Sequence, residues 1–207
     1  CGFAAADAGR VDDQVAAAAA RGFRLLGIAE ADAPGVELPD DPREVRFRWL
    51  GLIAFADPLR AEVPEAVARC RGAGIRVVMI TGDHPVTAVA IARAAGISGS
   101  GGVLSGDDLN AMDDEQLSRA ARDVSIFARV RPDQKLRLVR AFRSAGEVVA
   151  MTGDGVNDAP ALRAAHIGVA MGQRGTDVAR EAASLVLLRD DFGSIVRAVE
   201  LGRRIYE

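Results

Sequence analysis

The 207-residue sequence is poor in cysteine, in aromatic residues and in excess positive charge, and each shortage excludes a class of protein. Only Cys1 and Cys70 are present, without metal-ligand spacing or a disulfide framework, so we expect a reducing cytosolic setting. Aromatic residues make up 4% and the formal net charge is −3, which leaves neither a base-stacking platform nor a polyanion-binding surface. We therefore expect no nucleic-acid partner.

Long hydrophobic runs are also missing. None approaches the roughly 20 apolar residues that a membrane helix requires, and the first residues lack the pattern of a secretory signal. The chain opens without Met and runs into an alanine-rich tract, so we expect a soluble piece of a longer polypeptide. What is present, 49% hydrophobic and 27% charged residues, is typical of a globular protein with one substantial core.

The first quarter of the sequence predicts a small unit of one helix and two strands. An alanine-rich helix over about 12–21 precedes a strand over Arg24–Ala29, and Phe47–Ala56 is a second apolar run of strand length. Between them, residues 31–42 are rich in Asp and Pro and predict a loop. We set a domain boundary near Asp57-Pro58, so that the units are residues 1–56 and 57–207.

Beyond that boundary, helical segments alternate with apolar strands, which predicts an α/β fold with a parallel sheet and crossover helices. One predicted helix has Pro85 in its first turn and Gly96 at its end, an arrangement common in helices. We predict helices over about 63–72, 85–95, 107–122, 132–145 and 192–206, strands over about 75–80, 125–130, 148–151, 167–171 and 185–188, and a flexible stretch at 98–102.

The tripeptide Thr-Gly-Asp occurs twice, at Thr81–Asp83 and Thr152–Asp154, each time directly after a strand. In an open parallel sheet, ligands bind beyond the carboxyl ends of the strands, so both loops are expected to line one crevice. Gly82 and Gly153 allow backbone amides to approach a ligand, and the threonine hydroxyls can donate to anionic oxygens. The pattern predicts a phosphoryl-binding crevice. For the first copy alone, an ordinary turn in which Asp83 caps the next helix is an equal alternative.

The second copy carries a denser set of oxygen donors. Asp154, Asn157 and Asp158 fall within five residues, in a glycine-rich loop before Pro160. Two buried carboxylates this close would repel each other unless a cation lies between them, and oxygen ligands of this kind suit Mg²⁺. Capping of a helix by Asp158 alone would leave Asp154 unexplained. We therefore predict a magnesium site here.

Lys135 is the only lysine among 26 basic residues. A lysine ammonium acts on phosphate as a compact point charge, whereas arginine presents a planar fork. The alternative is a solvated helix residue next to Asp133. The surrounding motif favours a role at the phosphate.

Four segments of the sequence form a recognisable set: Asp57-Pro-Leu-Arg60, Thr81-Gly-Asp83, Phe127-Ala-Arg-Val-Arg-Pro-Asp-Gln-Lys135 and Met151-Thr-Gly-Asp-Gly-Val-Asn-Asp-Ala-Pro-Ala-Leu162. Together they resemble the P-type ATPases, and the last and longest segment is the most specific. The resemblance extends from about Leu50 to Glu207, and the residues before Leu50 resemble the end of a nucleotide-binding domain.

The resemblance implies a haloacid dehalogenase-like, Rossmann-type fold and a cytoplasmic catalytic domain of an ATP-driven membrane cation transporter. Its cofactors would be Mg²⁺ and ATP, and its partners the membrane, actuator and nucleotide-binding parts of the pump. The variant Thr81-Gly-Asp-His-Pro-Val-Thr-Ala88 looks most like calcium-type pumps. By resemblance, Asp154 and Asp158 hold the metal with Asn157 in support, Thr81, Gly82 and Lys135 contact the phosphoryl group, and Asp83, Arg60 and Arg129 face the nucleotide.

The sequence departs from that family in one important respect: the Asp-Lys-Thr-Gly-Thr motif that carries the phosphorylated aspartate does not occur in it. In the family this motif follows a central strand between the strands that end in Thr81 and Thr152. Those two strands must therefore pair directly, leave a gap or borrow a strand. Two alternative functions stay open, a phosphatase with Asp57 as nucleophile and a non-catalytic Mg²⁺-binding or interaction module.

Overall fold

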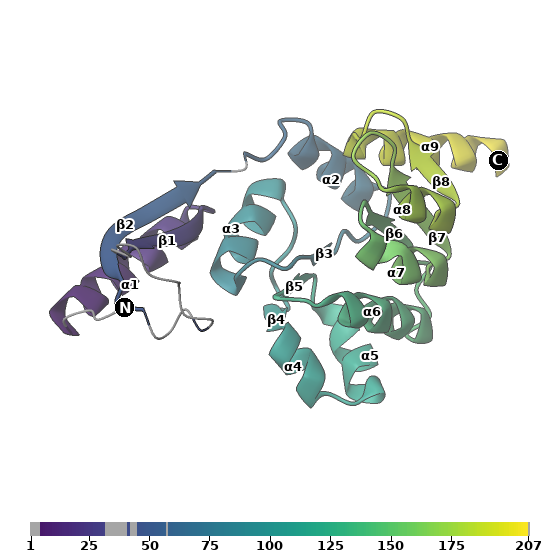
Figure 1. Ribbon diagram of the computed structural model, residues 1–207. Coiled ribbons are helices and arrows are strands. Elements are labelled where there is room, and N and C mark those ends of the chain that lie inside the picture. Colours follow the sequence, from purple (N-terminus) through teal and green to yellow (C-terminus); the bar gives the residue numbers. More distant parts are fainter. Residues whose placement is uncertain (1–4, 32–40, 42–44, 57, 207) are drawn as a thin grey trace. The chain divides into compact units, whose positions relative to one another are not determined.

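The computed structural model describes residues 5–31, 41, 45–56 and 58–206. The chain divides into two compact units, residues 1–58 and 59–207, each with its own internal packing (Figure 1). Asp57 and most of the predicted loop 31–42 lie outside the described residues. Among the described helices, none combines the length and apolar composition that a bilayer span needs.

The first unit is a helix packed on a two-stranded ribbon. Helix α1 (Ala5–Ala20) starts earlier than the predicted 12–21, because Ala5, Ala6 and Ala8 also favour a helix. Strands β1 (Arg24–Glu30) and β2 (Arg48–Phe55) pair antiparallel, with an irregularity between Ile28 and Ala29. A Cβ on Gly27 would lie 2.7 Å from the ring of Trp49, so the glycine makes room for the indole.

The second unit contains two parallel sheets among its described residues. The first has the order β3-β5-β4, and the second has the order β6-β7-β8. The strands are β3 (Met79–Ile80), β4 (Val103–Ser105), β5 (Ile126–Ala128), β6 (Ala150–Gly153), β7 (Ile167–Met171) and β8 (Leu185–Leu187).

The helices of the second unit mostly match the prediction. The region 107–122, predicted as one helix, is instead two short helices, because Asp113 and Gln116 form a capping box that starts a new one. The helices are α2 (Val63–Gly72), α3 (Pro85–Ala95), α4 (Gly106–Ala111), α5 (Asp114–Asp123), α6 (Pro132–Ser144), α7 (Ala159–Ala164), α8 (Asp177–Ala182) and α9 (Phe192–Tyr206), with a short 3₁₀ turn at Val156–Asp158.

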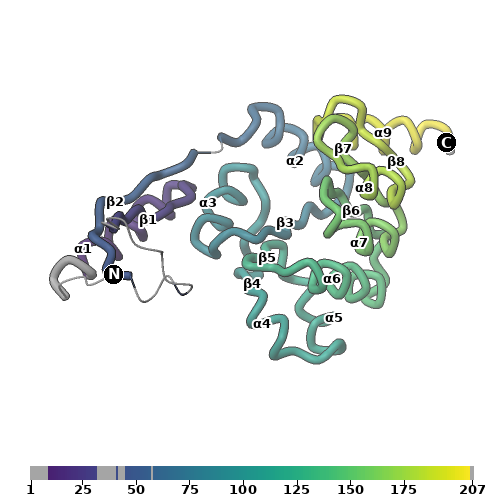
Figure 2. Tube along the Cα trace, in the orientation of Figure 1, coloured from purple at the N-terminus to yellow at the C-terminus, as the bar shows by residue number. Residues whose placement is uncertain are grey.

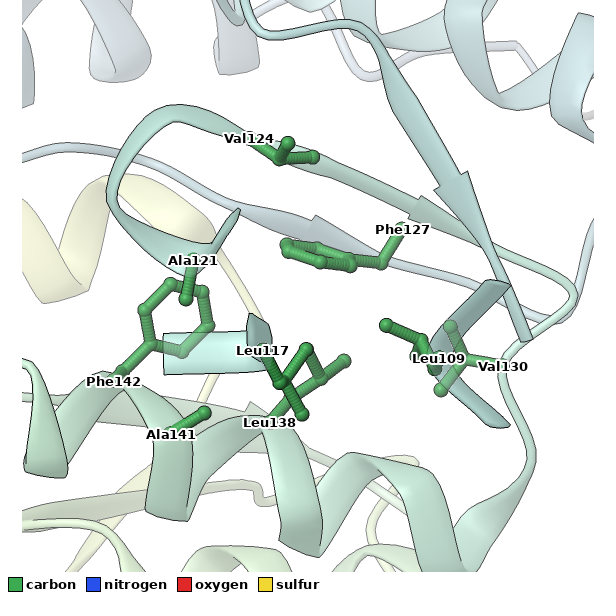
Figure 3. Close-up of a cluster of buried hydrophobic side chains, with 9 residues drawn as sticks. All are labelled: Leu109, Leu117, Ala121, Val124, Phe127, Val130, Leu138, Ala141 and Phe142. Atoms are coloured by element: carbon green, nitrogen blue, oxygen red, sulfur yellow. The ribbon is translucent and has the colours of Figure 1, made fainter. Parts of the chain in front are cut away.

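Strand β5 is the centre of the first sheet, and helices cover both of its faces. Successive side chains of a strand point to opposite faces, so Ile126 and Ala128 pack with α3 while Phe127 packs with α4, α5 and α6. The rings of Phe127 and Phe142 meet edge to face, with centroids 6.0 Å apart (Figure 3).

Helix α6 joins the two sheets. Leu138, Ala141 and Phe142 belong to the core around β5, whereas Val139 belongs to the core formed by β6, β7, α7 and α8. The Cα trace shows the chain leaving β5 and entering α6 directly (Figure 2). Because Pro132 lies in the first turn of α6 and Gly146 at its end has a φ of 87°, the sequence fixes where this connecting helix starts and stops.

Strands β3 and β6, which carry the two Thr-Gly-Asp loops, belong to separate sheets among the described residues. Of the three possible arrangements without the central strand, the described residues therefore show the second, in which β3 and β6 do not pair and a gap is left between them. Strand β3 is only two residues long instead of the predicted 75–80, and it pairs with β5 alone in the described ladders. Ile75 and Val77 of the predicted strand instead pack against α2 and α9, and they have no partner in the described ladders.

Candidate functional site

The first Thr-Gly-Asp loop closes on itself. The Thr81 hydroxyl donates to Asp83 Oδ2 at 2.9 Å, and the Asp83 amide donates back to Thr81 Oγ1 at 3.1 Å. The alternative in which Asp83 caps helix α3 is wrong. His84 occupies that position instead, and its Nδ1 accepts a bond from the Val86 amide at 3.4 Å.

The segment between β5 and α6 holds this loop in place. The Arg129 amide donates to the Asp83 carbonyl at 3.0 Å, and the Val130 amide donates to the Thr81 carbonyl at 3.0 Å. Arg129 has a φ of 52°, a left-handed conformation that costs a non-glycine residue about 1–2 kcal/mol. Arg129 is exposed.

Lys135, in the first turns of α6, reaches the second loop. Its Nζ lies 2.6 Å from Asp158 Oδ1, and the two side chains are 23% and 7% exposed. Asp158 Oδ2 also accepts bonds from the amides of Asp154 at 3.3 Å and Gly155 at 3.2 Å. The segment 129–135 therefore contacts both Thr-Gly-Asp loops, one through backbone amides and the other through its lysine.

Gly153 permits the close approach of Asp158. A Cβ at this position would lie 2.5 Å from Asp158 Cβ and 2.9 Å from its Cγ, distances that real atoms do not adopt. At Gly82 a Cβ would meet nothing within 4 Å. The glycine of the second loop is thus required by packing, and the glycine of the first is not.

The premise that Asp154 and Asp158 are both buried is wrong for Asp154. Asp158 is buried and its charge is balanced by Lys135, whereas Asp154 and Asn157 are exposed. In the described ranges, no three His, Cys, Asp or Glu side chains form a cluster suited to a metal ion. Mg²⁺ commonly uses only one or two carboxylates and keeps several waters. The donor set fits Mg²⁺ through Asp154 and Asn157, with Asp158 held behind them.

Arg60 lies at a different place from the phosphoryl loops. Its Nη1 donates to the carbonyl of Asp190, between β8 and α9. The Asp190 carboxylate accepts bonds from the amides of Gln173 at 3.0 Å and Arg174 at 2.8 Å. The amide of Gln173, foremost, holds the pKa of Asp190 below its ordinary value.

Sequence reasoning missed the loop after β7 as part of this region. The Thr176 amide donates to the Asp154 carbonyl at 2.8 Å. The sequence carries a signal for it: Gly172 and Gly175 follow β7, and the carboxyl end of a parallel strand next to β6 lies at the same edge of the sheet.

A family model described as haloacid dehalogenase-like hydrolase matches residues 4–166. The chain belongs to the haloacid dehalogenase-like hydrolase family. The predicted fold class, helices around parallel strands, agrees with that family and is confirmed.

Three relatives identify the kind of protein to which this chain is similar. It is 48% identical over 191 residues to the calcium-transporting ATPase of Bacillus subtilis and 50% over 196 residues to the probable cation-transporting ATPase F of Mycobacterium bovis. It is 42% identical over 222 residues to the sodium/potassium-transporting ATPase subunit alpha-2 of Rattus norvegicus. These matches cover 91%, 90% and 90% of this chain, and they confirm the resemblance to P-type ATPases.

The chain spans only about a fifth of those relatives: 22%, 21% and 22% of their respective lengths.

Proposed function

We propose that this chain is the phosphorylation-domain segment of an ATP-driven cation-transporting P-type ATPase, which holds Mg²⁺ and the transferred phosphoryl group. The observation that carries this proposal is the Lys135–Asp158 pair at 2.6 Å. It brings the chain's only lysine to the loop with the candidate metal ligands, and the same segment also holds Thr81–Asp83. Phosphoryl transfer depends mainly on such positioning and charge neutralisation.

Each side chain then has a role. Asp154 and Asn157 would hold Mg²⁺, which when bound neutralises charge on the phosphoryl oxygens. Asp158 orients Lys135, and Lys135 together with the Thr81 hydroxyl and the Gly82 amide binds the phosphoryl group. Asp83 and the exposed Arg129 guanidinium face the nucleotide. We assign Arg60 to Asp190 and not to the nucleotide, because its guanidinium already donates there.

The nucleophile would come from the rest of the pump. No Asp-Lys-Thr-Gly-Thr motif occurs in these residues, and β3 and β6 lie in separate sheets. A strand carrying the motif and pairing with both would join the sheets and bring its aspartate between the two loops. The membrane, actuator and nucleotide-binding parts, of which residues 1–56 would be a remnant, are the further partners, and the chain would face the cytoplasm.

Binding of Mn²⁺ as a magnesium substitute, measured by electron paramagnetic resonance, tests the metal site. We expect Asp154→Asn to raise the Kd more than about 10-fold, because the ion loses its one exposed carboxylate. Asp114→Asn is the matched control, since Asp114 is an exposed carboxylate that pairs with Arg137 on α6 and contacts neither loop in the described bonds. Equal affinities in Asp154→Asn and the unaltered chain would contradict the proposed site.

Incubation with ATP and Mg²⁺ tests the missing nucleophile. We expect no acid-stable phosphate on the chain alone, and phosphate on a co-expressed segment that supplies the Asp-Lys-Thr-Gly-Thr strand. Phosphate on an aspartate of the isolated chain would refute this assignment. The alternative that stays open from the sequence, a phosphatase that uses Asp57 as its nucleophile, makes a different prediction. Hydrolysis of a simple phosphoester that Asp57→Asn abolishes would establish it.

A further inference from the structure

The loop between β7 and α8, residues 172–176, is held at both ends by groups that lie outside it. The Gly172 amide donates to the Leu187 carbonyl at 2.9 Å. The Arg180 guanidinium donates to the carbonyls of Gly172 and Gly175. A Cβ on Gly175 would lie 1.9 Å from the Met171 carbonyl oxygen, so the loop backbone is folded tightly on the end of β7.

The amides of this loop converge on one buried carboxylate. Asp190 is 6% exposed, and its two oxygens accept from the Gln173 and Arg174 amides at 3.0 and 2.8 Å. These bonds favour the ionised carboxylate, so the pKa of Asp190 is lowered. Asp190 itself has a φ of 49°, and Arg60 holds its carbonyl. Bonds from the loop amides to an ionised carboxylate are charge-assisted and stronger than bonds to a neutral acceptor, so Asp190 holds the loop firmly.

The far end of the same loop contacts the backbone of Asp154. The Thr176 amide donates to the Asp154 carbonyl at 2.8 Å, and the Asp154 amide donates to Asp158 Oδ2 at 3.3 Å. Both polar groups of the Asp154 peptide backbone are therefore restrained, one by the loop and one by the Lys135–Asp158 pair. Because a metal ligand must be held in a defined position, a shift of this loop would displace the Asp154 backbone and the carboxylate that it carries.

From this chain of contacts we propose that Asp190 is a positioning residue for the metal site, acting through residues 173–176 on Asp154. The inference rests on the proposed function, since it concerns the same metal ligand. Arg60 begins the chain of contacts at the Asp190 carbonyl, two residues after the end of the first unit at Pro58.

The neighbouring Asp191 provides a matched control. Its carboxylate is also bound by strong donors, the Ser194 amide at 2.7 Å, the Ser194 hydroxyl at 2.6 Å and Arg197 at 3.0 Å. The Ser194 hydroxyl, foremost, lowers the pKa of Asp191. These contacts belong to α9 and not to the β7–α8 loop. Asp190→Asn and Asp191→Asn thus each remove one ionised, hydrogen-bonded carboxylate from the same turn, with different consequences for Asp154.

Two measurements on the whole chain test the proposal. In Asp190→Asn, the side-chain NH₂ replaces one carboxylate oxygen and cannot accept a hydrogen bond from the loop amide that it faces, so that bond is lost. We expect the Thr176 amide then to exchange with solvent at least about 10-fold faster. We expect the Mn²⁺ Kd to rise about 3–10-fold, less than the roughly 10–100-fold typical of groups that hydrogen-bond a ligand directly. Asp191→Asn is expected to leave both quantities within about 1.5-fold of the unaltered chain.

The outcomes separate this inference from the proposed function. Unchanged Thr176 exchange and Mn²⁺ affinity in Asp190→Asn would overturn the inference and leave the metal site intact. Equal changes in both Asn variants would overturn it too, because they would reflect general loosening of the turn. Failure of the unaltered chain to bind Mn²⁺ would overturn the proposed function and the inference together. If Asp190→Asn does not fold, Arg60→Met serves instead, with faster Thr176 exchange expected and unchanged exchange overturning the inference.

Discussion

The two Thr-Gly-Asp loops have the same three residues after a parallel strand, yet they form different structures. In the first, Thr81 and Asp83 bond to each other, and the loop is complete without a partner side chain from elsewhere in the chain. In the second, Asp154 is exposed, and the structural carboxylate is Asp158, four residues later. The tripeptide alone therefore does not define the loop, because the following residues decide which carboxylate is fixed and which is free to bind a ligand.

The difference extends to the packing around each loop. The second loop depends on a lysine from α6 and on a glycine that makes room for Asp158. The first depends on backbone amides of residues 129 and 130, which every substitution other than proline leaves in place. A glycine substitution in the second loop is thus expected to affect stability more strongly than its counterpart in the first.

The largest effect is expected for Gly153→Ala. The new Cβ would overlap with Asp158, so the loop must shift, and we expect a loss of about 3 kcal/mol in the free energy of unfolding of the second unit. Urea unfolding followed by circular dichroism measures it, with the fluorescence of Trp49, in the first unit, as an internal reference. In the control Gly155→Ala, the Cβ would lie 3.5 Å from Asp158 Oδ2, an ordinary contact, and little change is expected. Equal effects of the two substitutions would contradict the packing argument.

The second largest effect is expected for Lys135→Met, which leaves the buried Asp158 without its cation. We expect a loss of about 2–3 kcal/mol, somewhat below that for completely buried pairs, because Lys135 is 23% exposed. The same urea experiment measures it. Arg119→Met is the control, because the Arg119–Glu115 pair is 68% and 87% exposed and is expected to contribute less than about 0.5 kcal/mol. A loss as small as that of the control would show that the Lys135–Asp158 contact does not stabilise the fold.

The sequence predicts those helices and strands of the second unit whose bounds are set by neighbouring residues along the chain. The bounds of β7 and α9 are as predicted, since hydrophobic periodicity and flanking turns specify them. Strand β4 and helix α8 were missed, because three- and six-residue elements carry too little periodic signal. Asp113 and Gln116 are the residue types of a capping box and indicate the break between α4 and α5, but the helical pattern over 107–122 led to the prediction of one helix.

The candidate site shows the same division. The parallel arrangement of the strands predicts that the loops after Thr81 and Thr152 lie at the same edge, near the segment 129–135 that connects β5 to α6. That Lys135 bonds to Asp158, and that Arg60 bonds to the Asp190 carbonyl, depends on side-chain contacts between residues 23 and 130 positions apart. Such contacts leave no trace in a single sequence. The functions assigned to these residues stay predictions.

A smaller effect is expected for Thr81→Val. The substitution keeps the shape of the side chain but removes the hydroxyl that donates to Asp83 and accepts from its amide, so we expect a loss of about 1 kcal/mol. Thr152→Val tests the same change in the second loop, where the side chain is exposed, and a loss below about 0.5 kcal/mol is expected. Urea unfolding compares them. A larger loss of stability in Thr152→Val than in Thr81→Val would contradict the conclusion that the first loop is the one stabilised by its own threonine.

The smallest effect is expected for Gly82→Ala, the counterpart of the most harmful substitution. A Cβ here meets nothing within 4 Å, and Gly82 is not among the glycines with positive φ, so alanine fits the existing backbone. Alanine also restricts the unfolded chain, and we expect a change between zero and a gain of about 0.5 kcal/mol. Urea unfolding measures it, and a loss above about 1 kcal/mol would mean that the first loop is packed as tightly as the second. If stability is kept while phosphate binding weakens, the role of this glycine would lie in giving the ligand access to the loop amide and not in folding.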